Sequence, residues 1–72
     1  MSRTLEFRVT GMHCGSCGML IDDAVEELDG VTSSTTDARA ERTVVELDDV
    51  SPIDDEDIIA AIEEAGYRAV RA

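Results

Sequence analysis

The stretch Leu5–Gly30, "LEFRVTGMHCGSCGMLIDDAVEELDG", changes its hydrophobic period part-way along. Its first six residues alternate, with Leu5, Phe7 and Val9 on one face and polar side chains on the other, which predicts a half-buried strand. A glycine breaks this pattern. From about Ser16 apolar residues recur every three or four positions, which predicts an amphipathic helix. The stretch therefore predicts a strand, a loop and a helix in succession.

The predicted first helix carries its apolar residues in one stripe. The members of this stripe are Cys17, Leu20, Ile21, Ala24, Val25 and Leu28. Acidic residues are expected to fill the other face: Asp22, Asp23, Glu26 and Glu27. Gly30 follows the last apolar position, where helices commonly end on a glycine, so we expect Gly30 just past the end of this helix.

The second half of the chain first predicts two strands. Residues 31–37, "VTSSTTD", are β-branched and polar and favour an edge strand, although the serines and threonines leave its packing open. Residues 43–48, "TVVELD", alternate more clearly, with Thr43, Val45 and Leu47 on one face. A turn between the two strands is expected even though this segment lacks Gly and Pro.

A second helix and a last strand complete the chain. We expect the helix to begin at an Asp54 cap with Asp57 as the reciprocating residue, or alternatively at Ser51 with Pro52 in the first helical position. Gly66 ends the helix, and "YRAVRA" predicts a short final strand. The stripe expected to be buried on this helix consists of Ile58, Ile59, Ile62 and Ala65.

The order of these elements defines the predicted fold. We interpret residues 1–72 as one domain with the order β-α-β-β-α-β. This is the order of an α+β, ferredoxin-like βαββαβ sandwich, in which two helices lie on one face of a four-stranded antiparallel sheet. One Phe, one Tyr and no Trp in 72 residues predict a thin, mostly aliphatic core.

The charge of the chain excludes several classes of partner. It has 17 acidic residues against six basic ones, a formal net charge of −11, and all six basic residues are Arg. Such a chain lacks the basic patches that nucleic acids and anionic membrane surfaces require. An acidic, lysine-free composition is typical of proteins adapted to high salt, where repulsion between like charges is screened, so we expect a halophilic source.

The opening of the chain bears on its location. "MSRTLEFRVT" alternates in polarity and lacks the positive-then-apolar order of a signal segment. No apolar run approaches the roughly 20 residues that a membrane-spanning helix needs. We therefore expect a cytoplasmic protein without direct membrane binding.

The segment "GMHCGSC", Gly11–Cys17, holds both cysteines and the only histidine of the chain. A C-x-x-C pair is typical of an intracellular metal site or a redox pair, and a helix beginning beside it favours the thiolate form through its N–H groups and dipole. Two thiolates suffice for Cu(I), whereas Zn(II) takes about four ligands, so the cysteine count favours Cu(I). From the residues alone, a dithiol oxidoreductase remains the alternative.

The whole chain resembles the heavy-metal-associated domain family. The resemblance rests on "GMHCGSC", on Ile21, Ala24 and Val25, on "LDGV", and on "IIAAIEEAGY". It departs from the family pattern only in the serines and threonines of the second strand. The members of this family are copper chaperones, metal-binding domains of P-type metal ATPases, and mercury-binding relatives, and they have the βαββαβ fold.

The resemblance implies roles for individual residues. Cys14 and Cys17 would be the two metal ligands, and Met12 would pack under the loop rather than bind the metal. Tyr67 lies where the family places a residue near the metal loop. His13 is either a solvated loop residue or an auxiliary ligand, as an Asp is at this position in zinc-transporting relatives.

The function implied by the resemblance is that of a cytosolic Cu(I) metallochaperone rather than an enzyme, with no catalytic residue. It would deliver copper to a P-type ATPase by thiolate ligand exchange, as a monomer or as a metal-bridged homodimer. A chain that starts at Met1 and has the length of one domain favours a standalone chaperone over an excised ATPase domain. A Zn(II) or Cd(II) carrier that uses His13, and a mercury-binding protein, are two further functions that the resemblance allows.

Overall fold

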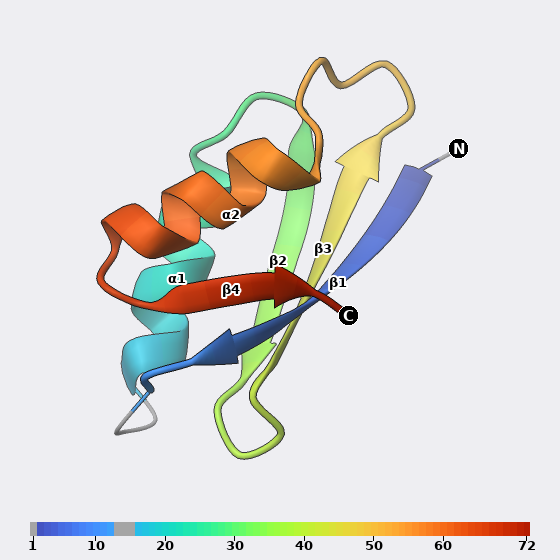
Figure 1. Cartoon of the computed structure of the whole chain (residues 1–72). Helices are drawn as coiled ribbons and strands as arrows, with labels where there is room; N and C mark the ends of the chain where they lie inside the picture. The colour runs from blue at the N-terminus through green and yellow to red at the C-terminus, as the bar shows by residue number, and fades with distance from the viewer. Residues whose placement is uncertain (1, 13–15) are drawn as a thin grey trace.

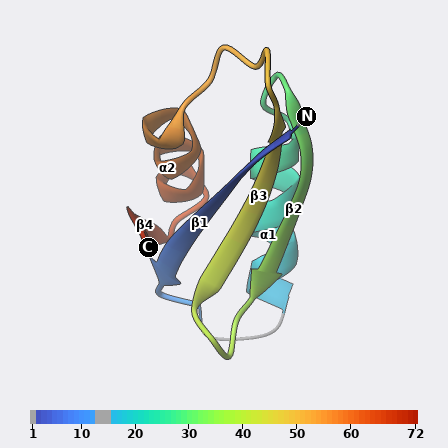
Figure 2. The same ribbon diagram turned by 90° about the vertical axis from the view of Figure 1, so that its right-hand side faces the viewer.

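The computed structural model of the chain describes residues 2–12 and 16–72. Its elements follow in the predicted order: β1 (Ser2–Thr10), α1 (Ser16–Glu26), β2 (Val31–Asp37), β3 (Arg42–Asp48), α2 (Asp55–Glu64) and β4 (Arg68–Arg71). The strands form one antiparallel sheet in the order β2-β3-β1-β4, so β2 is an edge strand, as predicted. Both helices cover one face of this sheet and leave the other open (Figure 1 and Figure 2), which confirms the ferredoxin-like sandwich.

The core lies between the helices and the covered face of the sheet. Alternate residues of β1 and β3 point into it, because successive side chains of a strand face opposite ways. Its fully or almost fully buried apolar members are Phe7, Val9, Ile21, Val25, Val45, Leu47, Ile58, Ile62 and Ala69. Ile59 is half-buried and packs against this cluster, as the predicted stripe of α2 requires.

The hairpin between β2 and β3 obtains its turn from an acidic side chain. Asp37 Oδ1 accepts hydrogen bonds from the backbone N–H groups of Arg39 and Ala40, at 3.0 and 3.2 Å. An Asp side chain that accepts hydrogen bonds from backbone N–H groups a few residues later stabilises a turn. Glu41 completes the turn with a φ of 53°. A turn without Gly or Pro thus forms because Asp37 precedes it.

Helix α2 has defined caps at both ends. The Asp54 N–H donates to Asp57 Oδ2 at 3.1 Å within a capping box, which confirms the first of the two predicted starts. At the other end Gly66 adopts a φ of 101°. Its N–H donates to the carbonyl of Glu63, and the Tyr67 N–H donates to the carbonyl of Ile62. These two bonds form a Schellman motif, so Gly66 ends the helix as predicted.

Two predictions for α1 are wrong. Leu20 is 56% exposed rather than part of the buried stripe, because the buried face of the helix is centred on Gly18, Ile21 and Val25. Gly30 does not end α1, since the helix stops at Glu26. Gly30 instead lies in the turn before β2 with a φ of 85°, where a Cβ would lie 2.3 Å from the hydroxyl oxygen of Ser51.

Candidate metal-binding site

The candidate site lies where the chain passes from β1 to α1. Gly11, with a φ of 93°, directs the chain away from the end of β1. Met12 is half-buried and packs against the core, as predicted for a residue that supports the loop. Helix α1 then begins at Ser16, which places Cys17 in its first turn with a partly exposed side chain.

The segment between Met12 and α1 lies outside the described residues. It comprises His13, Cys14 and Gly15, so the predicted ligand roles of Cys14 and His13 remain predictions. The two ends of this segment are nevertheless held by the fold, one through the half-buried Met12 and the other through the first turn of α1. Of the two predicted ligands, the structure therefore places Cys17 alone, in the first turn of α1.

Tyr67 lies beside the start of the loop. The Schellman motif at the end of α2 sets its backbone, and its half-buried ring packs against the core. A Cβ at Gly11 would lie 3.9 Å from Tyr67 Cδ1, so the ring is in van der Waals reach of the loop. The structure thus confirms that Tyr67 is next to the predicted metal loop.

A polar cluster fixes the first half of α1 to the edge strand β2. Asp22 Oδ1 accepts a hydrogen bond from the hydroxyl of Ser34 at 2.8 Å and another from the hydroxyl of Thr36 at 2.7 Å. Thr36 and Thr43 share a further hydroxyl bond at 2.9 Å. Since the single proton of Thr36 goes to Asp22, Thr43 is the donor in that pair. The cluster therefore links α1 to β2 and β3.

This cluster explains the polar sequence of β2 and corrects the prediction for Asp22 and Glu26. Ser34 is only 7% exposed, and Thr43 is fully buried, yet their hydroxyls have partners. The backbone N–H of Ser34 also donates to Glu26 Oε2 at 3.1 Å. Both acidic residues thus contact β2, although only Asp22 is half-buried and Glu26 is exposed. Sequence reasoning missed this, although the serines and threonines opposite an acidic helix were its signal.

Close packing of Gly18 completes this attachment. Gly18 is buried, and a Cβ there would lie 3.3 Å from Thr36 Cβ. The small residue therefore allows the first turn of α1, with Cys17, to approach β2 closely.

The exposed apolar surface beside Cys17 comes from its other neighbours on the helix. Met19 is 69% exposed and Leu20 is 56% exposed. The stretch from Gly11 to Leu20 contains no Asp, Glu or Arg, in a chain where such residues are frequent. The helix residues that follow Cys17 therefore present exposed apolar side chains, and the acidic residues of α1 begin at Asp22.

The described residues contain neither a second candidate metal site nor a helix that could span a membrane. Among residues 2–12 and 16–72, no group of three or more His, Cys, Asp or Glu side chains is arranged to hold a metal ion. Within the same residues, neither helix is long and apolar enough to cross a membrane.

The position of Cys17 at the start of the helix that follows β1 agrees with a comparison of sequences. Residues 6–68 match the heavy-metal-associated domain family. The chain belongs to this family. Within this heavy-metal-associated domain, the matched range includes the loop, both helices and the first residue of β4.

Relatives of this heavy-metal-associated domain occur as separate proteins and as parts of larger ones. Copper chaperone CopZ of Enterococcus hirae is 36% identical over 64 residues, which are 89% of this chain and 91% of that protein. Copper-transporting ATPase 1 of Rhizobium meliloti is 34% identical over 62 residues, which are 86% of this chain but 7% of that protein.

Solved structures give the same result for the fold. A copper binding domain from HMA7, a P-type ATPase, superposes with a TM-score of 0.90 and 30% identity, covering 97% of this chain and 93% of that domain. A CopZ metallochaperone superposes with a TM-score of 0.88 and 31% identity, covering 94% of this chain and 100% of that one.

Proposed function

We propose that this heavy-metal-associated domain binds one Cu(I) ion through Cys14 and Cys17 and passes it to another protein. The observation that carries the proposal is the position of Cys17, partly exposed in the first turn of α1 and next to the exposed side chains of Met19 and Leu20. Relatives of this length that match almost end to end are copper chaperones, which supports the same metal here.

The ligand set favours Cu(I) over Zn(II). Soft thiolates select Cu(I), and two of them suffice, whereas Zn(II) usually takes four ligands. Met12 packs against the core and is therefore assigned no ligand role. His13 is the one further donor in the loop, so the zinc alternative depends on it.

Transfer would proceed by ligand exchange. A thiolate of the receiving protein approaches beside the partly exposed Cys17 and binds the copper ion, which becomes three-coordinate. Either Cys14 or Cys17 then dissociates, and a second thiolate of the receiving protein replaces the other. No bond of a substrate is formed or broken in this sequence, so we assign no enzymatic activity. Copper is the cargo of the protein rather than its cofactor.

The proposed receiving protein is a copper-transporting P-type ATPase. Met19 and Leu20, exposed beside Cys17, would meet its metal-binding domain, because an uncharged contact avoids the repulsion between acidic surfaces. Docking there would bring the thiolates of both proteins together. The match to one segment of an ATPase supports the alternative that this chain is itself such a domain, which would receive copper instead.

The test is the coordination of copper in the reduced chain. Anaerobic loading followed by X-ray absorption spectroscopy should show one Cu(I) per chain with two sulfur neighbours, in the wild type and in His13→Ala alike. Loss of a nitrogen neighbour in His13→Ala would instead support the carrier that uses His13. Copper without sulfur neighbours would refute the proposal.

A further inference from the structure

Positive charges are concentrated at one end of the open sheet face. The register pairs Arg8 of β1 directly with Arg42 of β3. Their neighbours Phe7 and Thr43 point into the core, so both arginines point away from the helices. Arg68 of β4 pairs with Thr10, two positions further along β1 from Arg8. Like charges placed directly opposite in a sheet are destabilising, and here Asp37 of β2, which pairs with Arg42 on its other side, offsets part of this repulsion.

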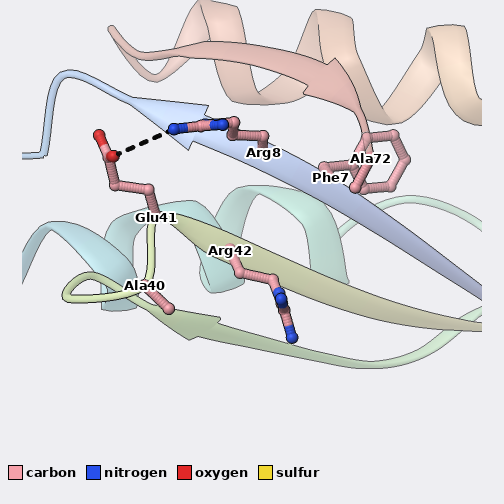
Figure 3. Close-up of a pocket in the computed structure, with 6 residues that line it drawn as sticks. All are labelled: Phe7, Arg8, Ala40, Glu41, Arg42 and Ala72. Atoms are coloured by element: carbon pink, nitrogen blue, oxygen red, sulfur yellow. Dashed lines mark ion pairs between the residues drawn. The ribbon is translucent and has the colours of Figure 1, made fainter.

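A surface pocket lies between the two paired arginines. It has a volume of about 260 Å³ and is lined by Phe7, Arg8, Ala40, Glu41, Arg42 and Ala72. Figure 3 shows Arg8 extending toward Glu41, whereas the guanidinium group of Arg42 points away from both residues. A pocket of this size accepts a small ion or a short side chain rather than a folded partner.

The carboxylate in the pocket neutralises Arg8 only weakly. Arg8 and Glu41 form an ion pair at 3.9 Å, with side chains that are 68% and 45% exposed. Exposed pairs of this kind contribute little, on the order of 0–1 kcal/mol. Because Arg8 and Arg42 are both exposed and long, their guanidinium groups can turn into the pocket when a stronger partner enters.

We propose that this pocket binds a small oxyanion, a phosphate or a carboxylate, between Arg8 and Arg42. Guanidinium groups match both anions, because their parallel N–H groups donate to two oxygens at once. An anion held between the two arginines would also relieve their mutual repulsion. Glu41 would compete with the anion for Arg8. The inference rests on the sheet face alone and does not depend on the proposed copper function.

The test is a titration of the chain with sodium phosphate, and separately with sodium acetate, at matched ionic strength, followed by amide chemical shifts. We expect saturable shifts in the millimolar range that are confined to the neighbourhood of Arg8 and residues 40–42. Saturation with either anion supports the site and identifies the oxyanion it prefers. Linear, unsaturated shifts with both anions would overturn the proposal.

Single substitutions distinguish anion binding in the pocket from an effect of the net charge of the chain. Arg8→Gln and Arg42→Gln should each weaken binding about threefold or more. The matched control Arg3→Gln makes the same charge change at the far end of β1, and it should leave binding unchanged. Glu41→Gln should tighten binding, whereas Glu64→Gln on α2 should not. The site would be refuted if Arg3→Gln weakened anion binding as much as Arg8→Gln does, or if Glu64→Gln tightened it as much as Glu41→Gln does. Either result would show that binding depends only on the net charge of the chain.

Discussion

Replacement of Asp22 tests whether the polar cluster holds α1 against β2. Asp22→Ala removes the acceptor of two hydrogen bonds, from Ser34 at 2.8 Å and from Thr36 at 2.7 Å. A hydrogen bond to a charged group contributes about 1.5–3 kcal/mol, but these two share one oxygen of a half-buried carboxylate. Alanine has a higher helix propensity than aspartate, and this offsets about 0.5 kcal/mol of the lost free energy of unfolding. We therefore expect a net loss of about 2 kcal/mol in the free energy of unfolding.

The matched control for this change is the neighbouring residue. Asp23 is exposed and carries the same charge, so Asp23→Ala reproduces both the change in net charge and the gain in helix propensity. Its effect should stay within about 0.5 kcal/mol. Asp22→Asn keeps an acceptor oxygen without the charge and should fall between Asp22→Ala and the wild type.

Urea denaturation of the three variants at one salt concentration measures these differences. For a domain of this size, 2 kcal/mol corresponds to a decrease in Tm of about 8–16 °C. Equal stability of Asp22→Ala and Asp23→Ala, within about 0.5 kcal/mol, would refute the reasoning. It would show that the hydroxyls of β2 find equivalent partners in water and that α1 is held by apolar packing alone.

Three further predictions concern single positions. Gly30→Ala should lower the free energy of unfolding by about 1–3 kcal/mol, because φ is 85° and the new Cβ would meet Ser51. Gly66→Ala should lower it by less, because its φ of 101° is also unfavourable but the new Cβ would enter open space. Thermal melts compare the two variants. Ile62→Val, at a fully buried position, should cost about 0.5–1.5 kcal/mol in urea denaturation, and an unchanged midpoint would contradict its place in the core. Leu20→Ser should change the free energy of unfolding by less than about 0.5 kcal/mol, because Leu20 is exposed. The same variant should transfer Cu(I) to an ATPase metal-binding domain more slowly than the wild type in a stopped-flow assay. An unchanged rate would exclude this surface from docking.

The sequence predicted correctly those elements in which the hydrophobic period and the capping residues indicate the same structure. Alternation in β1 and β3 and the stripe of α2 led directly to the sandwich, and the Asp54 cap and Gly66 marked the ends of α2. In α1 the apolar stripe was assigned by spacing alone. Spacing places Leu20 as well as Ile21 on one face, but only the position of β2 decides which side is buried.

The edge strand β2 was predicted with the bounds that the structure has, but its packing was left open for a related reason. Serines and threonines in an edge strand ordinarily indicate a solvated surface. Here Ser34 is buried because an acidic side chain of α1 accepts its hydroxyl proton, and that pairing depends on tertiary contacts between segments 12 residues apart. The acidic residues of α1 are likewise predicted on the polar face from their spacing relative to the apolar stripe. A strongly biased composition thus obscured the two carboxylates of α1 that bond to β2, Asp22 and Glu26.

The site itself was predicted from local sequence and in part from the family resemblance. The structure confirms that Met12 packs against the core, that Cys17 lies in the first turn of α1, and that Tyr67 lies beside the loop. The metal-binding roles of Cys14 and Cys17 and the role of His13 remain predictions, since His13 and Cys14 lie outside the described residues.

Competition for Cu(I) is the most direct test of the central claim, that two thiolates at the start of α1 bind the ion. Reduced, anaerobic chain is titrated against a Cu(I)-specific chromogenic chelator, together with Cys14→Ser, Cys17→Ser and Met12→Leu. We predict that the wild type and Met12→Leu retain one Cu(I) per chain and that either serine variant loses it to the chelator. Retention of copper by both serine variants, or its loss from the wild type, would contradict the account.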